Sequence, residues 1–164
     1  MARRALVAIV LPTLVGCVVA QVTPGMARIP GPVGRVDVMI APDLAEDRLE
    51  RYRDLEGDRV IREAIERELM RVGVWRPGGD VGVQVTVTAF RLRSATNVFF
   101  SGWYAGDDEL FGLIEIHPAA AAPQPIAFRF SSNDEVFFNF SSGARFRRLV
   151  NALAHAIHTR VDAS

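Results

Sequence analysis

The chain contains 164 residues, of which 19 are arginine, none is lysine and 19 are acidic, so its formal charge is zero. The balanced charge argues against bulk attraction to nucleic acid, and the absence of lysine excludes both a phosphate-binding loop that ends in lysine and a Schiff-base lysine. Cys17 is the only cysteine, so an intrachain disulfide and a CxxC redox site are excluded as well.

Residues 1–16 predict a signal peptide. Arg3 and Arg4 form a positive start, and a mostly apolar run extends from Ala5 to Val15. A membrane-spanning helix needs about 20 apolar residues, so this run is too short to be one.

The segment ends on Leu14-Val15-Gly16-Cys17, which resembles the lipobox of bacterial lipoproteins. The resemblance implies that diacylglycerol is attached to the Cys17 sulfur, that cleavage occurs before Cys17, and that the new amino group receives a fatty acid such as palmitate. Several acyl chains on one residue bind durably, so the mature protein would stay on a membrane. Val18 follows in place of the aspartate that favours inner-membrane retention in enterobacteria, so we expect the outer membrane, facing the periplasm.

Two other interpretations of the signal segment stay open. Val18-Val19-Ala20 fits an ordinary signal peptidase, which would cleave before Gln21, discard Cys17 and release a soluble secreted protein. The segment can also remain uncleaved as an anchor.

Residues 17–34 are expected to form the lipidated cysteine and a flexible tether, and residues 35–164 a single domain. Small and apolar residues between Val18 and Gly34 are punctuated by Pro24, Pro30 and Pro32, with no helical or strand period.

Alternating apolar residues predict the strands. They cover Arg35–Ala41, the valine-rich stretch from Val81 to Ala89 and its continuation to Arg93, Glu109–His117 and Ile126–Phe130, and Val74–Trp75 would add a short one. Phe90 and Leu92 interrupt the polar side of the valine-rich strand near its end.

Helical spacing predicts two amphipathic helices. Asp58 is a suitable N-cap for the first, whose apolar stripe runs from Val60 to Val72 until Gly73 ends it. The second has a stripe from Phe146 to Val161. A short helix is one interpretation of the charged residues 43–57, and a solvated connection is the favoured one.

These elements predict an α+β fold: a two-layer sandwich with a mixed or antiparallel sheet of about four to five strands and two helices on one face. The order of elements behind a lipobox resembles small bacterial lipoproteins whose domains have no known function, and at fold level the α+β domains of periplasmic assembly lipoproteins. Ile61–Gly73, Val81–Arg93 and Arg147–Val161 support this resemblance, which implies no catalytic residue.

His155 and His158 are three residues apart on the last predicted helix, a spacing that can direct two imidazoles toward one metal ion. No third or fourth ligand follows a recognisable pattern, so both are interpreted as solvated residues, and no metal or other cofactor is expected. The acidic residues at 107–109 and 134–135 are interpreted as turn residues. A Gly-x-Ser-x-Gly elbow and a Gly-x-Gly-x-x-Gly motif are absent from the sequence, so we do not predict an enzyme.

Candidate contact residues lie in two aromatic segments and at the start of the last helix. They are Phe99, Phe100, Trp103 and Tyr104; Phe137, Phe138 and Phe140; and Arg145, Arg147 and Arg148. The aromatic residues either form a surface covered by a partner or membrane, or pack together on the sheet face that lacks helices. The arginines either contact anionic lipid headgroups or pair with surface acids.

The sequence thus predicts a membrane-anchored envelope lipoprotein with a structural, accessory or partner-binding role and no catalytic activity. The alternatives are a periplasm-facing binding module for a lipid or other apolar ligand and, less favoured, an enzyme. The expected partners are the membrane, through lipid on Cys17, and an envelope protein, but no nucleic acid.

Overall fold

The computed structural model describes residues 18–22, 29–93, 107–119, 122–132 and 141–159. Its strands are β1 Val18–Val22, β2 Val33–Ile40, β3 Val81–Arg91, β4 Asp108–His117 and β5 Gln124–Ser132. Its helices are α1 Glu46–Asp54, α2 Gly57–Arg71 and α4 Ser142–His158.

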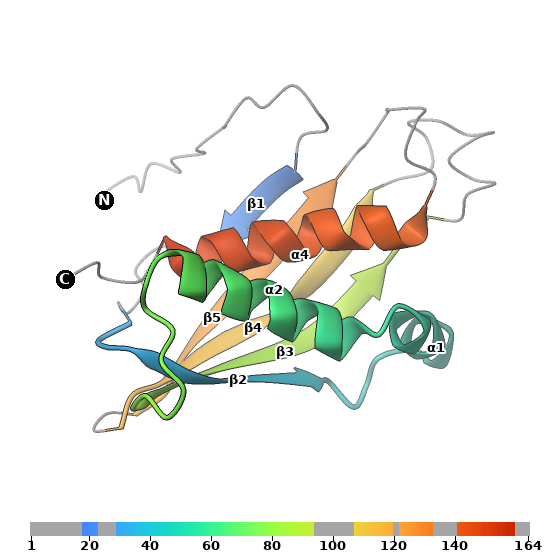
Figure 1. Ribbon diagram of the computed structural model, residues 1–164. Helices are drawn as coiled ribbons and strands as arrows, with labels where there is room; N and C mark the ends of the chain where they lie inside the picture. Colours follow the sequence, from blue (N-terminus) through green and yellow to red (C-terminus); the bar gives the residue numbers. More distant parts are fainter. Residues whose placement is uncertain (1–17, 23–28, 94–106, 120–121, 133–140, 160–164) are drawn as a thin grey trace, which may run out of the picture.

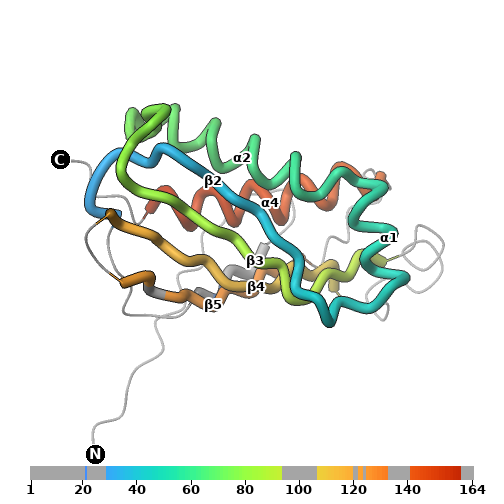
Figure 2. Tube along the Cα trace, turned by 90° about the horizontal axis from the view of Figure 1, so that it is seen from below, coloured from blue at the N-terminus to red at the C-terminus, as the bar shows by residue number. Residues whose placement is uncertain are grey.

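The strands form one sheet in the order β1-β5-β4-β3-β2. β2 and β3 run parallel, and the other neighbouring strands run antiparallel. α2 and α4 lie side by side across one face of the sheet, and α1 lies at one end (Figures 1 and 2). The predicted two-layer α+β sandwich is therefore confirmed, with a mixed sheet of five strands.

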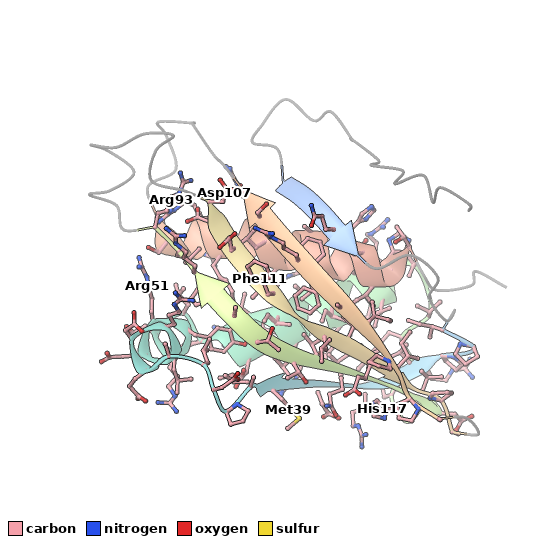
Figure 3. The ribbon with its side chains drawn as sticks, turned by 180° about the vertical axis from the view of Figure 1, so that it is seen from behind. Met39, Arg51, Arg93, Asp107, Phe111 and His117 are labelled. Atoms are coloured by element: carbon pink, nitrogen blue, oxygen red, sulfur yellow. The ribbon has the colours of Figure 1, made fainter. Side chains whose placement is uncertain are left out.

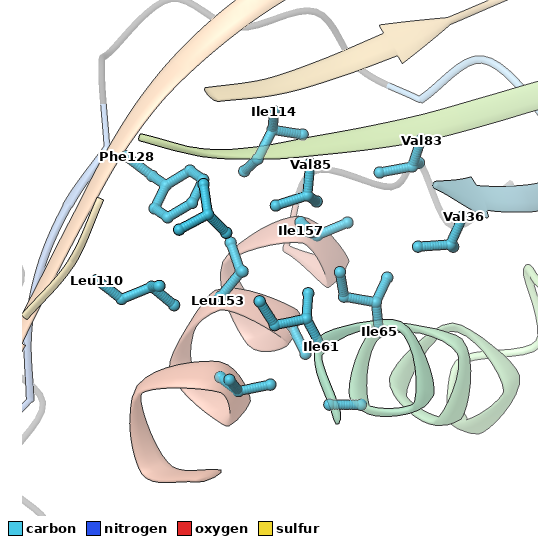
Figure 4. Close-up of a cluster of buried hydrophobic side chains, with 14 of the residues drawn as sticks. Val36, Ile61, Ile65, Val83, Val85, Leu110, Ile114, Phe128, Leu153 and Ile157 are labelled. Carbon is cyan, nitrogen blue, oxygen red and sulfur yellow. The ribbon is translucent and has the colours of Figure 1, made fainter. Parts of the chain in front are cut away.

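The core lies between the sheet and the two long helices. Val85 of β3, Ile65 of α2 and Leu153 of α4 are fully buried, and Figure 4 shows their side chains converging. The alternation that predicted β3 places every second side chain on this face, while Thr86 on the other face is only partly buried. The packing of the sheet against both helices therefore follows the apolar periodicity.

A bulge in β3 explains why the alternation breaks near the end of this strand. The pairing with β4 shifts register between Val87 and Ala89, so Phe90 returns to the core side and is 1% exposed. Gly112 of β4 lies opposite Val87, and an added Cβ there would lie 2.1 Å from the Thr86 carbonyl oxygen. A glycine thus permits close backbone approach beside the bulge.

The prediction of a solvated connection over residues 43–57 is wrong, because α1 forms there. Tyr52 anchors this charged helix: its ring packs edge-on against Phe90 and Phe146, and its hydroxyl donates a hydrogen bond to Asp58 at 2.9 Å. Asp58 therefore holds Tyr52 and is not the N-cap of α2, which begins at Gly57 after Glu56 in a left-handed conformation. Gly73 ends α2 with a φ of 77°, as expected.

The tether prediction for residues 17–34 is wrong for the part that the structure describes. Val18–Val22 is an edge strand of the sheet, paired with β5. Ile29 and Val33 are 1% and 0% exposed, because they enter the core. Hydrogen bonding to the free edge of β5 and burial of apolar side chains outweigh the disorder that proline and glycine suggest.

Candidate functional site

One end of the sheet combines the start of the described chain with a cluster of arginines. Val18 of β1 pairs with Ser132 of β5, and Ser132 pairs on its other side with Asp108 of β4. We call this end of the domain the Ser132 end. Arg93 and Asp107 lie here, while His117 lies at the opposite end (Figure 3). Cys17, the predicted lipid-bearing residue, directly precedes Val18 in the sequence.

A buried ion pair organises the Ser132 end. Arg145, in the first turns of α4, donates from Nη1 to both carboxylate oxygens of Asp108 at 2.9 Å, and the two side chains are 3% and 1% exposed. The Arg93 backbone N–H donates to Asp108 at 2.8 Å, and Arg145 Nη2 donates to the Arg93 carbonyl at 2.7 Å. The pair thus ties the start of α4 to the ends of β3 and β4.

A second guanidinium group lies beside this carboxylate, and a third contacts the neighbouring main chain. Arg93 Nε lies 3.5 Å from Asp108, and Arg51 of α1 donates to the carbonyls of Leu92 and Arg93 at 2.9 and 3.3 Å. Arg93 Nε and Nη2 and Arg145 Nε have no hydrogen-bond partner within the described part of the chain. Among these described side chains, the two buried guanidinium groups of Arg93 and Arg145 lie beside one buried carboxylate.

An open hollow of about 220 Å³ adjoins the cluster. Its lining residues are Asp47, Arg48, Arg51, Phe90, Arg91 and Leu92. Arg48 and Arg147 are exposed at the Ser132 end, on α1 and α4 respectively. This end thus presents arginine on several elements, a surface suited to anionic groups.

Arg145 corrects one of the sequence predictions. It was expected either to contact anionic lipid headgroups, as part of a partner- or membrane-binding surface, or to pair with a surface acid. It does pair with an acid, but its Nη1 donates to Asp108 in the protein interior, so Arg145 has no free surface. Asp108 is likewise buried rather than a solvated turn residue. An arginine near a helix N-terminus is disfavoured by the helix dipole, so its presence there indicates a compensating contact. The sequence does not show that this contact is with Asp108.

The remaining predicted contact residues divide into two groups. Arg147 is exposed and Arg148 half-buried on α4. Cys17 and the aromatic residues lie outside the described residues: they are Phe99, Phe100, Trp103, Tyr104, Phe137, Phe138 and Phe140. The described residues that flank both aromatic segments belong to the Ser132 end.

A second cluster of titratable groups lies at the other end of α2 and α4. Glu68 of α2 accepts two hydrogen bonds from Arg71, at 2.9 and 2.8 Å, and lies 2.9 Å from Nδ1 of His158. The Arg71 hydrogen bonds and charge, with a smaller contribution from His158, outweigh burial and hold the pKa of Glu68 below its usual value, at about 2. Sequence spacing indicated the histidines but not this glutamate.

The sheet face without helices is partly apolar. Phe111 lies near its middle and Met39 toward the β2 edge (Figure 3). Met39 and Leu113 are 52% and 37% exposed, while Arg129 stacks 4.8 Å from the Phe111 ring centroid and pairs with Glu109. In the described part of the chain, no helix is long and apolar enough to cross a membrane.

No protein-family model and no curated protein sequence matches the chain. A solved structure of a PelC dodecamer from Paraburkholderia phytofirmans is similar, with a TM-score of 0.56 and 11% identity over 90% of this chain and 99% of that chain. A dodecamer of a PelC point variant gives a TM-score of 0.51 and 10% identity over 88% and 98%. At this level of identity, the similarity establishes a shared fold.

Proposed function

We propose that this protein is an envelope lipoprotein, anchored through lipid on Cys17, whose domain lies directly on the membrane as a non-catalytic structural or accessory component. The observation behind the proposal is the position of β1, which begins at Val18. Cleavage before Cys17 leaves this strand whole. Cleavage before Gln21, in the soluble alternative, would remove three of its five residues.

Loss of those residues would leave the edge of β5 partly unpaired. Val18, Val19 and Ala20 pair with Ser132, Ser131 and Phe130. Unpaired N–H and C=O groups on a strand edge can pair with other chains and cause aggregation. A mature protein that keeps β1 has these groups of β5 paired and is therefore less prone to aggregate. This argument favours the lipoprotein interpretation over secretion.

The same strand supports a proposal for the orientation of the domain on the membrane. One residue spans at most about 3.8 Å, so lipid on Cys17 would place the Ser132 end at the headgroups without a spacer. The exposed Arg48 and Arg147 at this end would then face anionic phosphates. An arginine near an anionic surface contributes about 1 kcal/mol. We propose the outer membrane, facing the periplasm, as the location.

Vesicle flotation tests the anchor and the orientation separately. The full chain from cells that perform lipidation should float with vesicles at high salt, and Cys17→Ala should not, because only the acyl chains resist screening. Equal flotation of the two proteins at high salt would contradict lipidation of Cys17.

The orientation is tested with unlipidated Cys17→Ser protein on vesicles that contain anionic phosphatidylglycerol. Arg48→Gln and Arg147→Gln should each weaken low-salt binding about fivefold, the equivalent of about 1 kcal/mol. The matched control is Arg76→Gln, an exposed arginine at the far end, which should have little effect. An equal or larger effect of the Arg76 variant would contradict the orientation.

A second proposal is that copies of this chain associate with one another. The similarity to PelC, which forms dodecamers, favours it, and the open sheet face with Met39 and Leu113 supplies apolar surface. Light scattering after size exclusion of the uncleaved Cys17→Ser chain should give a mass of at least twice 18.0 kDa. A monomer at every concentration would contradict this proposal.

A further inference from the structure

Two histidines of α4 and one glutamate of α2 meet at the end of the helical layer that lies away from the Ser132 end. Glu68 Oε1 lies 2.9 Å from His158 Nδ1 and 3.7 Å from His155 Nδ1. One ligand atom from each residue lies within 4.8 Å of the others, and the two imidazole rings are 5.4 Å apart. From these distances we propose that Glu68, His155 and His158 form a binding site for a divalent transition metal, best suited to Zn²⁺.

The spacing of the ligand atoms matches a tetrahedral centre. Zinc binds imidazole nitrogen and carboxylate oxygen at about 2.0–2.2 Å, which separates neighbouring ligand atoms by about 3.4 Å. The two distances from Glu68, 2.9 and 3.7 Å, lie on either side of that value. Small side-chain rotations therefore suffice to bring the three donors around one ion.

Helix packing holds the backbone of each ligand. Glu68 precedes Leu69, His155 follows Ala154, and His158 follows Ile157; these three neighbours are 0%, 3% and 2% exposed and belong to the core. α2 and α4 pack against each other along their length. Binding thus needs little ordering of the main chain, which favours affinity.

Arg71 already places a cation at this position. Its Nη2 is 2.8 Å from Glu68 Oε1 and 3.5 Å from His158 Nδ1. The Arg71 side chain is 60% exposed, so its ion pair is a weak one that a metal ion can displace. Arg71 is therefore a competitor of the metal rather than a ligand.

The donor set indicates which metals fit. Two imidazoles and one carboxylate suit Zn²⁺ and similar transition metals, whereas Mg²⁺ prefers oxygen ligands alone. Three protein ligands leave a fourth position for water or an outside ligand. The His155 side chain is 57% exposed, so that position is reachable from solvent.

Zinc titration by calorimetry tests the site on the full chain without a histidine tag. Cys17→Ser removes the only thiol, and Mg²⁺ serves as the comparison ion. We expect one Zn²⁺ per chain and an affinity lowered at least about tenfold in His158→Ala, in Glu68→Ala and in His155→Ala. The His155 side chain is 57% exposed, so this last substitution perturbs the fold least. His117→Ala, which removes the third histidine of the sequence, should bind Zn²⁺ normally.

The Arg71→Ala variant distinguishes two interpretations of this cluster: a metal site and a group of solvent-exposed ion pairs. Removing the competitor should raise Zn²⁺ affinity several-fold, and Zn²⁺ should raise the melting temperature of the parent protein but not of His158→Ala. Absence of Zn²⁺ binding, equal binding by all variants or weaker binding by Arg71→Ala would each overturn the proposal. Its success or failure is independent of the lipid anchor at the opposite end.

Discussion

Asp108→Asn should be among the most destabilising polar substitutions in this domain. Asp108 accepts hydrogen bonds from Arg145 and lies 3.5 Å from Arg93 Nε, and its side chain is 1% exposed. The substitution keeps the shape but removes the charge, so the buried guanidinium groups of Arg93 and Arg145 lose this counterion. Breaking a buried pair in this way costs about 3–5 kcal/mol, a large fraction of the roughly 5–15 kcal/mol that stabilises a typical domain.

Arg145→Met should cost less than Asp108→Asn, toward the lower end of that range. Asp108 would still accept the Arg93 backbone N–H at 2.8 Å and lie 3.5 Å from Arg93 Nε. The double substitution should cost less than the sum of the two, because both changes remove the same interaction.

Urea denaturation followed by circular dichroism measures these differences on the Cys17→Ser chain. Arg59→Ala is the control, because Arg59 pairs with Glu63 on the exposed face of α2. This control should leave the midpoint nearly unchanged. If Asp108→Asn moved the midpoint no further than Arg59→Ala, the reasoning about the buried cluster would be refuted.

Two further predictions concern the core and α1. Val85→Ala and Ile65→Ala should each cost roughly 1 to 4 kcal/mol, and Thr86→Ala much less, because only the first two side chains are fully buried; equal denaturation midpoints for Val85→Ala and Thr86→Ala would contradict the strand register. Burial, followed by the charge and hydrogen bond of Asp58, raises the pKa of Tyr52 well above its usual value of about 10. Stability that depends on its neutral phenol is therefore complete below about pH 10 and lost as the pH rises through the folded-state pKa. An ultraviolet titration that follows phenolate absorbance measures this. In the parent protein Tyr52 should ionise only when alkaline pH unfolds the domain, so Tyr52→Phe should reduce the absorbance change at unfolding alone. If Tyr52→Phe instead removed an absorbance change near pH 10 in the folded protein, the prediction would be contradicted.

Much of the fold follows from local patterns in the sequence. The alternation around Val85 places the long strand in the sheet, and the apolar stripes that include Ile65 and Leu153 place both long helices against it. These patterns succeed because one face of each element is buried and the other is not. They fail at the bulge after Val87, where one extra residue reverses the alternation.

The elements that were missed depend on contacts distant in sequence. β1 is a short strand next to a signal segment, and it is stabilised by pairing with β5 more than one hundred residues later. α1 is mostly charged and is held by the buried ring of Tyr52 and by the hydrogen bonds of Arg51 to the Leu92 and Arg93 carbonyls. Valine enrichment in residues 18–22 is the one local signal that favoured β1.

The candidate sites show the same limit more strongly. The charge of Arg145 favoured a surface position. The sequence around Arg145 does not show that Asp108 lies within hydrogen-bonding distance of it in the fold. The spacing of His155 and His158 was visible, but Glu68 is brought to them only by the packing of α2 on α4. Sequence patterns indicate which side chains have useful chemistry, and the tertiary fold decides which of them meet.

The most direct test of the proposed function is the mass of the mature N-terminus, measured on protein isolated from membranes after expression with its own signal peptide. We expect Cys17 to be the first residue and to have the added mass of a diacylglyceryl group and an amide-linked fatty acid. β1 would then begin at the second residue of the mature protein. A mature chain that starts at Gln21, or a Cys17 without lipid, would contradict the account.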